Sequence, residues 1–121
     1  MTIHEEMLID GVMLWIEENM LQVKNIDSVA TKSGYSKWYL QRVFKKITGE
    51  SLGRYLMQKK MERATKLLTE TTLTINEIAI QLNYDSQQTF HRAFSRWQQV
   101  SPGYYRKTRT LIVDSPIGQQ E

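Results

Sequence analysis

The chain has 121 residues, 40% of them hydrophobic, and a formal net charge of +3, which predicts one compact domain or two small lobes with a real core and excludes a disordered chain. The absence of cysteine excludes disulfides, thiolate metal sites and thiol redox chemistry. No segment approaches the ~20 apolar residues of a membrane span and the N-terminus lacks an apolar signal segment, so we expect a cytoplasmic protein that does not enter membranes.

The N-terminal part of the chain predicts a helix from about residue 4 to residue 21, because its apolar residues recur with helical spacing. We expect this helix to support a first lobe, with Trp15 in the core rather than in a ligand site. A short helix over about 26–33 follows, capped by Asn25. Gly34 then supplies the left-handed turn residue that is typical of a helix-turn-helix.

The next helix, over about 37–48, is the most informative part of the sequence. Ser36 is placed to cap its start and Gly49 to end it in a left-handed conformation. Spacings of three and four residues put one apolar stripe on a single side: Leu40, Val43, Phe44 and Ile47. The opposite side is the first polar face, made of Trp38, Gln41, Arg42 and Lys45.

The chemistry of this first polar face suits base recognition in DNA. Glutamine and arginine have forked ends that pair with adenine and guanine edges in the major groove. The alternative is an amphipathic helix whose polar side has no specific partner.

A second copy of this unit lies roughly 50 residues downstream. Tyr35 recurs as Tyr84 and, after one inserted residue, Arg42 recurs as Arg92. The copy has an apolar stripe of Phe90, Ala93, Phe94 and Trp97. Its opposite side is the second polar face, made of Gln88, His91, Arg92 and Ser95. A duplicated unit with two such faces is hard to explain by core packing alone.

A long helix over about 52–70, capped by Ser51, connects the two units. Its basic side is either a solvated surface or a set of phosphate contacts: Arg54, Lys59, Lys60, Arg63 and Lys66. At ~1.5 Å per residue this helix is a rod of about 28 Å, somewhat shorter than the ~34 Å turn of B-DNA. Two helices held by it could therefore enter successive major-groove segments on one face of a duplex.

The second unit begins with a capping box, from Thr74 to Glu77, that opens a short helix to about residue 82. Asn83 stands at the position of the turn glycine, and asparagine also tolerates the left-handed region. Asp85 or Ser86 caps the second polar-faced helix, which runs to about residue 98. The serine–proline pair at 101–102 opens a last helix over about 102–107, and the tail beyond it has no sustained period.

These motifs resemble the AraC/XylS family of bacterial transcription activators, and in particular its small stand-alone branch, the MarA/SoxS/Rob/RamA group. The resemblance covers roughly residues 8–107. It is carried by GYSKWYLQRVFKK at 34–46, GESLGRYL at 49–56, YDSQQTFHRAF at 84–94 and SPGYYRK at 101–107.

The resemblance implies an all-α fold of seven helices: a helix-turn-helix lobe over 1–50, a linker helix over 51–70, a second lobe over 71–107 and a flexible tail over 108–121. It implies a monomer that binds an asymmetric site in double-stranded DNA and recruits RNA polymerase at stress and multidrug-tolerance genes. We expect no cofactor, no metal and no room for a small-molecule effector domain, so that abundance sets activity.

By position, the resemblance implies two sets of base-reading residues: Trp38, Gln41 and Arg42 in the first lobe, and Gln87, Gln88, Thr89 and Arg92 in the second. We add His91, which stands where close relatives carry a small hydroxyl residue. Its alternative is a contact to a phosphate or to water. Further basic residues are predicted to contact DNA phosphates: Lys37, Lys45, Lys46, Arg96 and Arg106. Gln98 and Gln99 replace the family's aromatic–glycine pair, which weakens the stop signal of that helix.

An enzyme is not expected, because the sequence has no glycine-rich phosphate loop, no nucleophile with a recognisable base and no supported carboxylate pair. Two other functions remain open on the sequence alone. A non-specific architectural DNA binder would need the basic charge but not the glutamine and tryptophan pattern. A helical module that binds polymerase would use the polar faces for protein docking.

Overall fold

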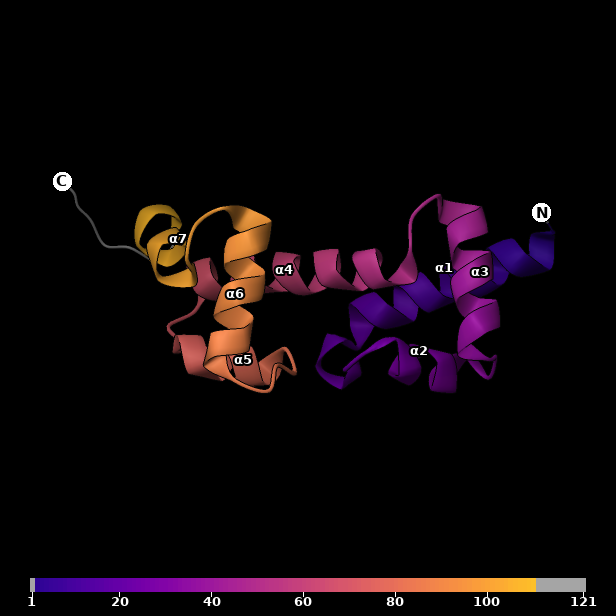
Figure 1. The fold of residues 1–121 in the computed structure, drawn as a ribbon, viewed down its shortest axis with the longest axis horizontal. Helices are drawn as coiled ribbons and strands as arrows, with labels where there is room; N and C mark the ends of the chain where they lie inside the picture. Colours follow the sequence, from indigo (N-terminus) through magenta and orange to yellow (C-terminus); the bar gives the residue numbers. More distant parts are fainter. Residues whose placement is uncertain (1, 111–121) are drawn as a thin grey trace. The chain divides into compact units, whose positions relative to one another are not determined.

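A computed structural model describes residues 2–110 (Figure 1). These residues contain no strand, and the predicted all-α class with seven helices is confirmed. The elements are α1 (Ile3–Glu18), a 3₁₀ turn η1 (Met20–Gln22), α2 (Ile26–Ser33), α3 (Lys37–Thr48), α4 (Leu52–Glu70), α5 (Ile75–Gln81), α6 (Gln87–Gln98) and α7 (Pro102–Arg109). No helix in this part of the chain is long and apolar enough to cross a lipid bilayer.

The chain divides into two compact units, residues 1–60 and 61–121. The boundary falls inside α4, so each unit contains one end of the helix that was predicted to be a separate linker. Helix α7 continues two residues beyond its predicted end at Lys107. Most of the predicted tail, residues 111–121, lies outside the described residues.

Every α-helix begins at a polar side chain that accepts a hydrogen bond from the backbone N–H three residues later. These bonds measure 3.0–3.1 Å and start at Thr2, Asn25, Ser36, Ser51, Thr74, Ser86 and Ser101. Each cap satisfies one of the donors that a helix start leaves free. The six caps from Asn25 onward follow the predicted positions, with Ser86 rather than Asp85 at α6, while the cap at Thr2 was not predicted.

Helix α1 ends three residues earlier than predicted, and the reason is local. Asn19 leaves helical geometry, with φ −131° and ψ 36°. Its side-chain Nδ2 donates to the carbonyl of Trp15 at 2.9 Å, and asparagine commonly competes for helix carbonyls in this way. The chain then turns through η1, which directs Met20 into the core at 6% exposure.

The core of the first unit gathers side chains from α1, α2, α3 and the start of α4. Leu40, Val43 and Phe44 from α3 have no exposed surface. The Phe44 ring lies 5.3 Å from the ring of Tyr55 on α4. Trp15 packs at the edge of this cluster and is only partly buried.

The core of the second unit is built around α6. Phe90 and Phe94 are fully buried, with ring centroids 5.8 Å apart. Tyr84 packs on Phe90, and Tyr105 of α7 packs on Phe94, each at 5.5 Å. The inner stripe of α6 is therefore held from both sides, which fixes the rotation of the helix about its axis.

Helix α6 ends where predicted although the family's glycine is missing. Gln99 adopts the left-handed conformation itself, with φ 68°, and its side-chain Nε2 donates to the carbonyl of Arg96 at 3.2 Å. The corresponding residue at the end of α3 is Gly49, with φ 84°. A residue with a Cβ is strained in this region by roughly 1–2 kcal/mol.

We therefore expect Gln99→Gly to raise the free energy of unfolding of the second unit by about 0.5–1 kcal/mol, because relief of strain outweighs the added flexibility of the unfolded chain. Thermal unfolding followed by circular dichroism measures the change. The matched control is Gln98→Gly, one residue earlier inside the helix, which should lower stability by about 1 kcal/mol. Equal losses from both substitutions would contradict the strain argument.

Candidate nucleic-acid interface

The first polar face stands on the outer side of α3. Because Leu40, Val43 and Phe44 of the inner stripe are fully buried, the opposite side chains face solvent: Trp38 is 69% exposed, and Arg42 and Lys45 are also exposed. Gln41 lies at the edge of this face and is half-buried. An exposed tryptophan of this size has no packing role here, so its apolar surface is available to a partner.

The Arg42 guanidinium lies close to two aromatic rings. Its central carbon lies 5.1 Å from the ring centre of Trp38 and 5.4 Å from that of Tyr39. Tyr39 in turn stacks on Tyr35 at 5.0 Å, and the Tyr35 hydroxyl shares a 2.9 Å hydrogen bond with Nε2 of His4 at the start of α1. Contacts of this kind reduce the freedom of a long side chain before it meets a ligand.

The sequence interpretation missed Tyr35, Tyr39 and His4 in this arrangement. The position of Tyr39, three residues before Arg42 on the same helix, was a usable signal, because residues at that spacing are neighbours on the helix surface. The link from Tyr35 to His4 joins residues 31 positions apart, and no local pattern predicts it.

The second polar face lies on α6. The predicted base-reading residues of this lobe are all exposed: Gln87, Gln88, Thr89, His91 and Arg92. The hydroxyl of Thr89 also lies 2.9 Å from the hydroxyl of its cap residue Ser86. Ser95 does not belong to the face as expected, since its Oγ is buried without a hydrogen-bond partner in the described part of the chain.

The two helices correspond residue for residue. Both have 12 residues and a serine N-cap, and both end at a left-handed C-cap. Arg42 and Arg92 occupy the same place within their helices, as do Gln41 and His91. Each unit therefore exposes one arginine at an equivalent point of an equivalent helix.

The predicted phosphate contacts on α3 and α6 are of two kinds: two lysines form ion pairs with carboxylates, and two other cations do not. Lys37 forms a 3.3 Å ion pair with Asp27, and Lys46 forms one of 3.1 Å with Glu5. Lys45 and Arg96 are exposed and form no ion pair within residues 2–110. The second pair of cations is therefore available to an anion without displacing a carboxylate.

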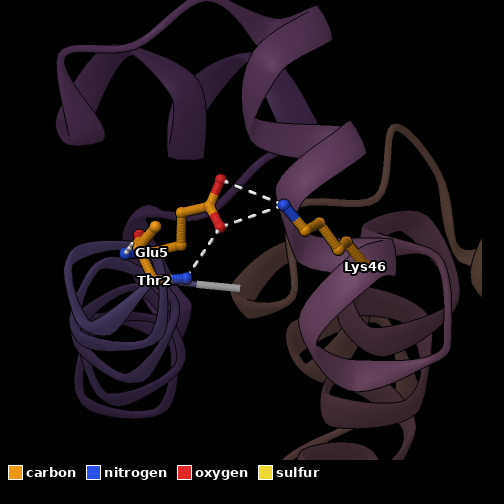
Figure 2. A network of polar contacts seen from close by, with 3 residues as sticks. All are labelled: Thr2, Glu5 and Lys46. Carbon is orange, nitrogen blue, oxygen red and sulfur yellow. Dashed lines mark hydrogen bonds and ion pairs between the residues drawn. The ribbon is translucent and has the colours of Figure 1, made fainter.

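The pair between Glu5 and Lys46 connects the start of α1 to the last turn of α3 (Figure 2). Both carboxylate oxygens of Glu5 accept from Lys46 Nζ, at 3.1 and 3.4 Å, while the Glu5 backbone N–H donates to Thr2 Oγ1. The bond from Lys46, together with the capping contacts at Thr2, lowers the pKa of Glu5 from its ordinary value of 4.5. The carboxylate is thus charged at neutral pH, and a DNA phosphate has to compete with it for Lys46.

The structure shows Arg106, which was predicted to contact a DNA phosphate, in hydrogen bonds within the protein. Its Nε donates to the carbonyl of Leu68 at 2.9 Å, and its Nη2 donates to those of Leu67 and Thr71 at 3.4 and 3.3 Å. The carbonyls of Leu67 and Leu68 belong to the last turn of α4 and that of Thr71 follows it; a helix end leaves acceptors free and its dipole favours positive charge there. Arg106 therefore joins α7 to α4 as a structural cap.

Part of the basic side of α4 is also used within the protein. Lys59 forms a 3.1 Å ion pair with Glu17 of α1. Lys60 is half-buried and donates to the carbonyl of Lys24 at 3.3 Å, and burial lowers the pKa of its ammonium group. These two lysines serve the first unit, whereas Arg63 and Lys66 are exposed in the second.

Comparison with known proteins agrees with this geometry. A model of the family described as "Helix-turn-helix domain" matches residues 29–108. The regulatory protein SoxS of Escherichia coli is 46% identical over 99 residues, covering 82% of this chain and 92% of SoxS. The transposon Tn10 TetD protein of Escherichia coli is 45% identical over 102 residues, covering 84% of this chain and 74% of TetD.

The chain belongs to the AraC/XylS family. It falls in the branch that includes SoxS and Rob, and it is a DNA-binding transcription regulator. The transcriptional regulator Rob of Salmonella typhimurium is 40% identical over 101 residues, but the chain spans only 35% of its length. Among solved structures, the C-terminal domain of AraT, a response regulator from Geobacillus stearothermophilus, superposes with a TM-score of 0.78 at 35% identity, covering 86% of this chain and 87% of that one.

The hydrogen bonds of Arg106 to backbone carbonyls predict that its replacement lowers the stability of the fold and leaves the phosphate contacts of the protein unchanged. We expect Arg106→Met to lower the free energy of unfolding by about 1.5–3 kcal/mol, because it removes charged hydrogen bonds to partly buried carbonyls. Urea denaturation measures the change. The matched control is its exposed neighbour, Lys107→Met, which should change stability by no more than about 0.5 kcal/mol. Unchanged stability with a reduced salt dependence of DNA binding would restore the phosphate role.

Proposed function

We propose that this AraC/XylS family member binds an asymmetric DNA site as a monomer, with α3 and α6 each in a major groove, and activates transcription by recruiting RNA polymerase. One observation supports the proposal above the others. Equivalent 12-residue helices expose Arg42 and Arg92 at the same helical position, opposite the fully buried residues of their inner stripes. Arginine in the major groove commonly donates both ends of its fork to guanine O6 and N7.

Asymmetry follows from the side chains that surround the two arginines. The first face offers Trp38 and Gln41 where the second offers Gln88 and His91. Unlike faces prefer unlike base pairs, so one chain is suited to two different half-sites without a second copy. His91 is proposed as a base-reading residue because it occupies the position of Gln41, and a phosphate contact is its alternative.

Phosphate contacts in this proposal come from the exposed cations beside the faces. Lys45 and Arg96 are the first candidates because no carboxylate holds them in the described part of the chain. Lys37 and Lys46 can follow by exchanging Asp27 and Glu5 for phosphate. Such contacts fix orientation and affinity, whereas the two polar faces supply the sequence preference.

The physiological role is proposed by likeness to relatives. The HTH-type transcriptional activator AarP of Providencia stuartii is 40% identical over 103 residues, covering 85% of this chain and 76% of AarP. Together with the resemblance to the small stand-alone branch, this supports a non-enzymatic, cytoplasmic activator of stress and multidrug-tolerance genes.

Selection of bound fragments from random duplex DNA tests this proposal first. We expect a motif with two unlike blocks about one helical turn apart. Arg42→Ala and Arg92→Ala should then each cost about 1–3 kcal/mol on the selected site, with relaxed preference at the contacted base pair. Binding is measured by fluorescence anisotropy on the selected duplex and on a random one.

The matched control for Arg42→Ala is Lys45→Ala, on the same face of the same helix. It should weaken binding to both duplexes alike and reduce the slope of log affinity against log salt by about one unit. Equal losses on both duplexes from Arg42→Ala would reject direct base recognition. Selection that yields no preferred sequence would favour an architectural binder, and polymerase binding without DNA affinity would favour a protein-docking module.

The aromatic pair around Arg42 makes a separate prediction. We expect Tyr39→Leu to reduce the preference for the selected site by about 0.5–1 kcal/mol, because Arg42 loses one of its two ring contacts. Tyr39→Phe keeps the ring and should bind like the parent chain. A double-mutant cycle with Arg42→Ala measures the coupling. A full effect of Arg42→Ala with zero coupling would refute the positioning role of Tyr39 but leave base recognition by Arg42 intact.

A further inference from the structure

An apolar cavity lies between α1 and α2, apart from the two polar faces. Its volume is about 370 Å³, within the range of sites that hold small organic molecules. Five lining residues come from α1 and three from α2: Met7, Leu8, Gly11, Val12, Trp15, Val29, Lys32 and Ser33. The indole of Trp15 and the side chains of Leu8 and Val29 provide walls for a flat or chain-like hydrocarbon body.

The cavity has one basic lining residue, Lys32. Lys32 lines it and is exposed, with Nζ 6.0 Å from the ring centre of Trp15. No carboxylate within residues 2–110 forms an ion pair with it. An ammonium group beside apolar walls favours a ligand that has an anionic head and an apolar body.

Gly11 contributes space to this surface. It lies in the middle of α1, where glycine weakens a helix relative to alanine. Packing does not require it, because a Cβ built at Gly11 would meet nothing within 4 Å. Its conformation is helical rather than left-handed. What the missing side chain does provide is room on the cavity side of α1.

We propose that this cavity is a binding site for a small amphipathic carboxylate, with the apolar body against Trp15, Leu8 and Val29 and the carboxylate on Lys32. A bound ligand contacts both α1 and α2, so it stabilises the first unit by an amount that grows with the logarithm of its concentration above Kd. The site shares no residue with the two polar faces and does not depend on how the protein recognises DNA.

The probe for the experiment is 2-naphthoate, with the uncharged 2-naphthamide as its isosteric partner. Each is added to the full chain up to about 5 mM, the weak end of ligand affinity. Nuclear magnetic resonance follows the indole N–H signals of Trp15, Trp38 and Trp97, assigned by tryptophan-to-phenylalanine variants. We expect the Trp15 signal to shift saturably while that of Trp97 stays fixed, and the melting temperature of the first unit to rise.

Two variants test the roles of the charge and of the space. Lys32→Met should weaken naphthoate binding about five-fold and leave naphthamide binding unchanged, whereas Lys66→Met on the second unit should alter neither. Gly11→Leu should abolish binding of both probes. Gly11→Ala, which strengthens the helix, controls for folding, and DNA binding by each variant reports that the chain remains intact.

The possible outcomes separate clearly. A saturable Trp15 shift that Lys32→Met weakens for the anion alone establishes the site. Equal binding of both probes, or no effect of Lys32→Met, would overturn the carboxylate assignment. No shift of Trp15, or shifts only at Trp38 or Trp97, would overturn the cavity as a binding site, and none of these results would bear on DNA recognition.

Discussion

The proposed function depends on the burial of one apolar stripe on each of two short helices. An α-helix repeats every 3.6 residues, so side chains about half a turn away from a buried stripe must face solvent. In α3 the buried stripe is Leu40, Val43 and Phe44, and in α6 it centres on Phe90 and Phe94. The exposure of Arg42 and Arg92 follows directly from that burial. A change that rotated either helix in its core would move the whole polar face with it.

The ends of the two helices matter as much as their stripes. A serine caps the start of each 12-residue helix, and a left-handed residue follows its end. Two helices of equal length and equal phase present their residues in the same order. Ending α6 in this way strains the backbone at Gln99, which adopts a left-handed conformation that suits glycine. Its bond to the carbonyl of Arg96 partly offsets the strain.

In the first unit, some basic side chains form ion pairs within the protein and others do not. Lysines on α3 and α4 are held by carboxylates of α1 and α2, as between Lys46 and Glu5 or between Lys59 and Glu17. Ion pairs at a protein surface are weak in water and are screened by salt. In the proposed complex, a DNA phosphate can therefore replace a carboxylate at little cost, while Lys45 needs no exchange.

The sequence by itself determined the features that depend on near neighbours. Helix starts from Asn25 onward, the two stripes and the repeat of the unit all follow from residues a few positions apart, and local sterics and hydrogen bonding act over that range. The tertiary structure alone decided the features that join distant residues. Examples are the capping of α4 by Arg106, the burial of Lys60 against Lys24 and the contact from Tyr35 to His4. A long polar side chain has many possible partners, and only the packed chain places one of them within hydrogen-bonding distance.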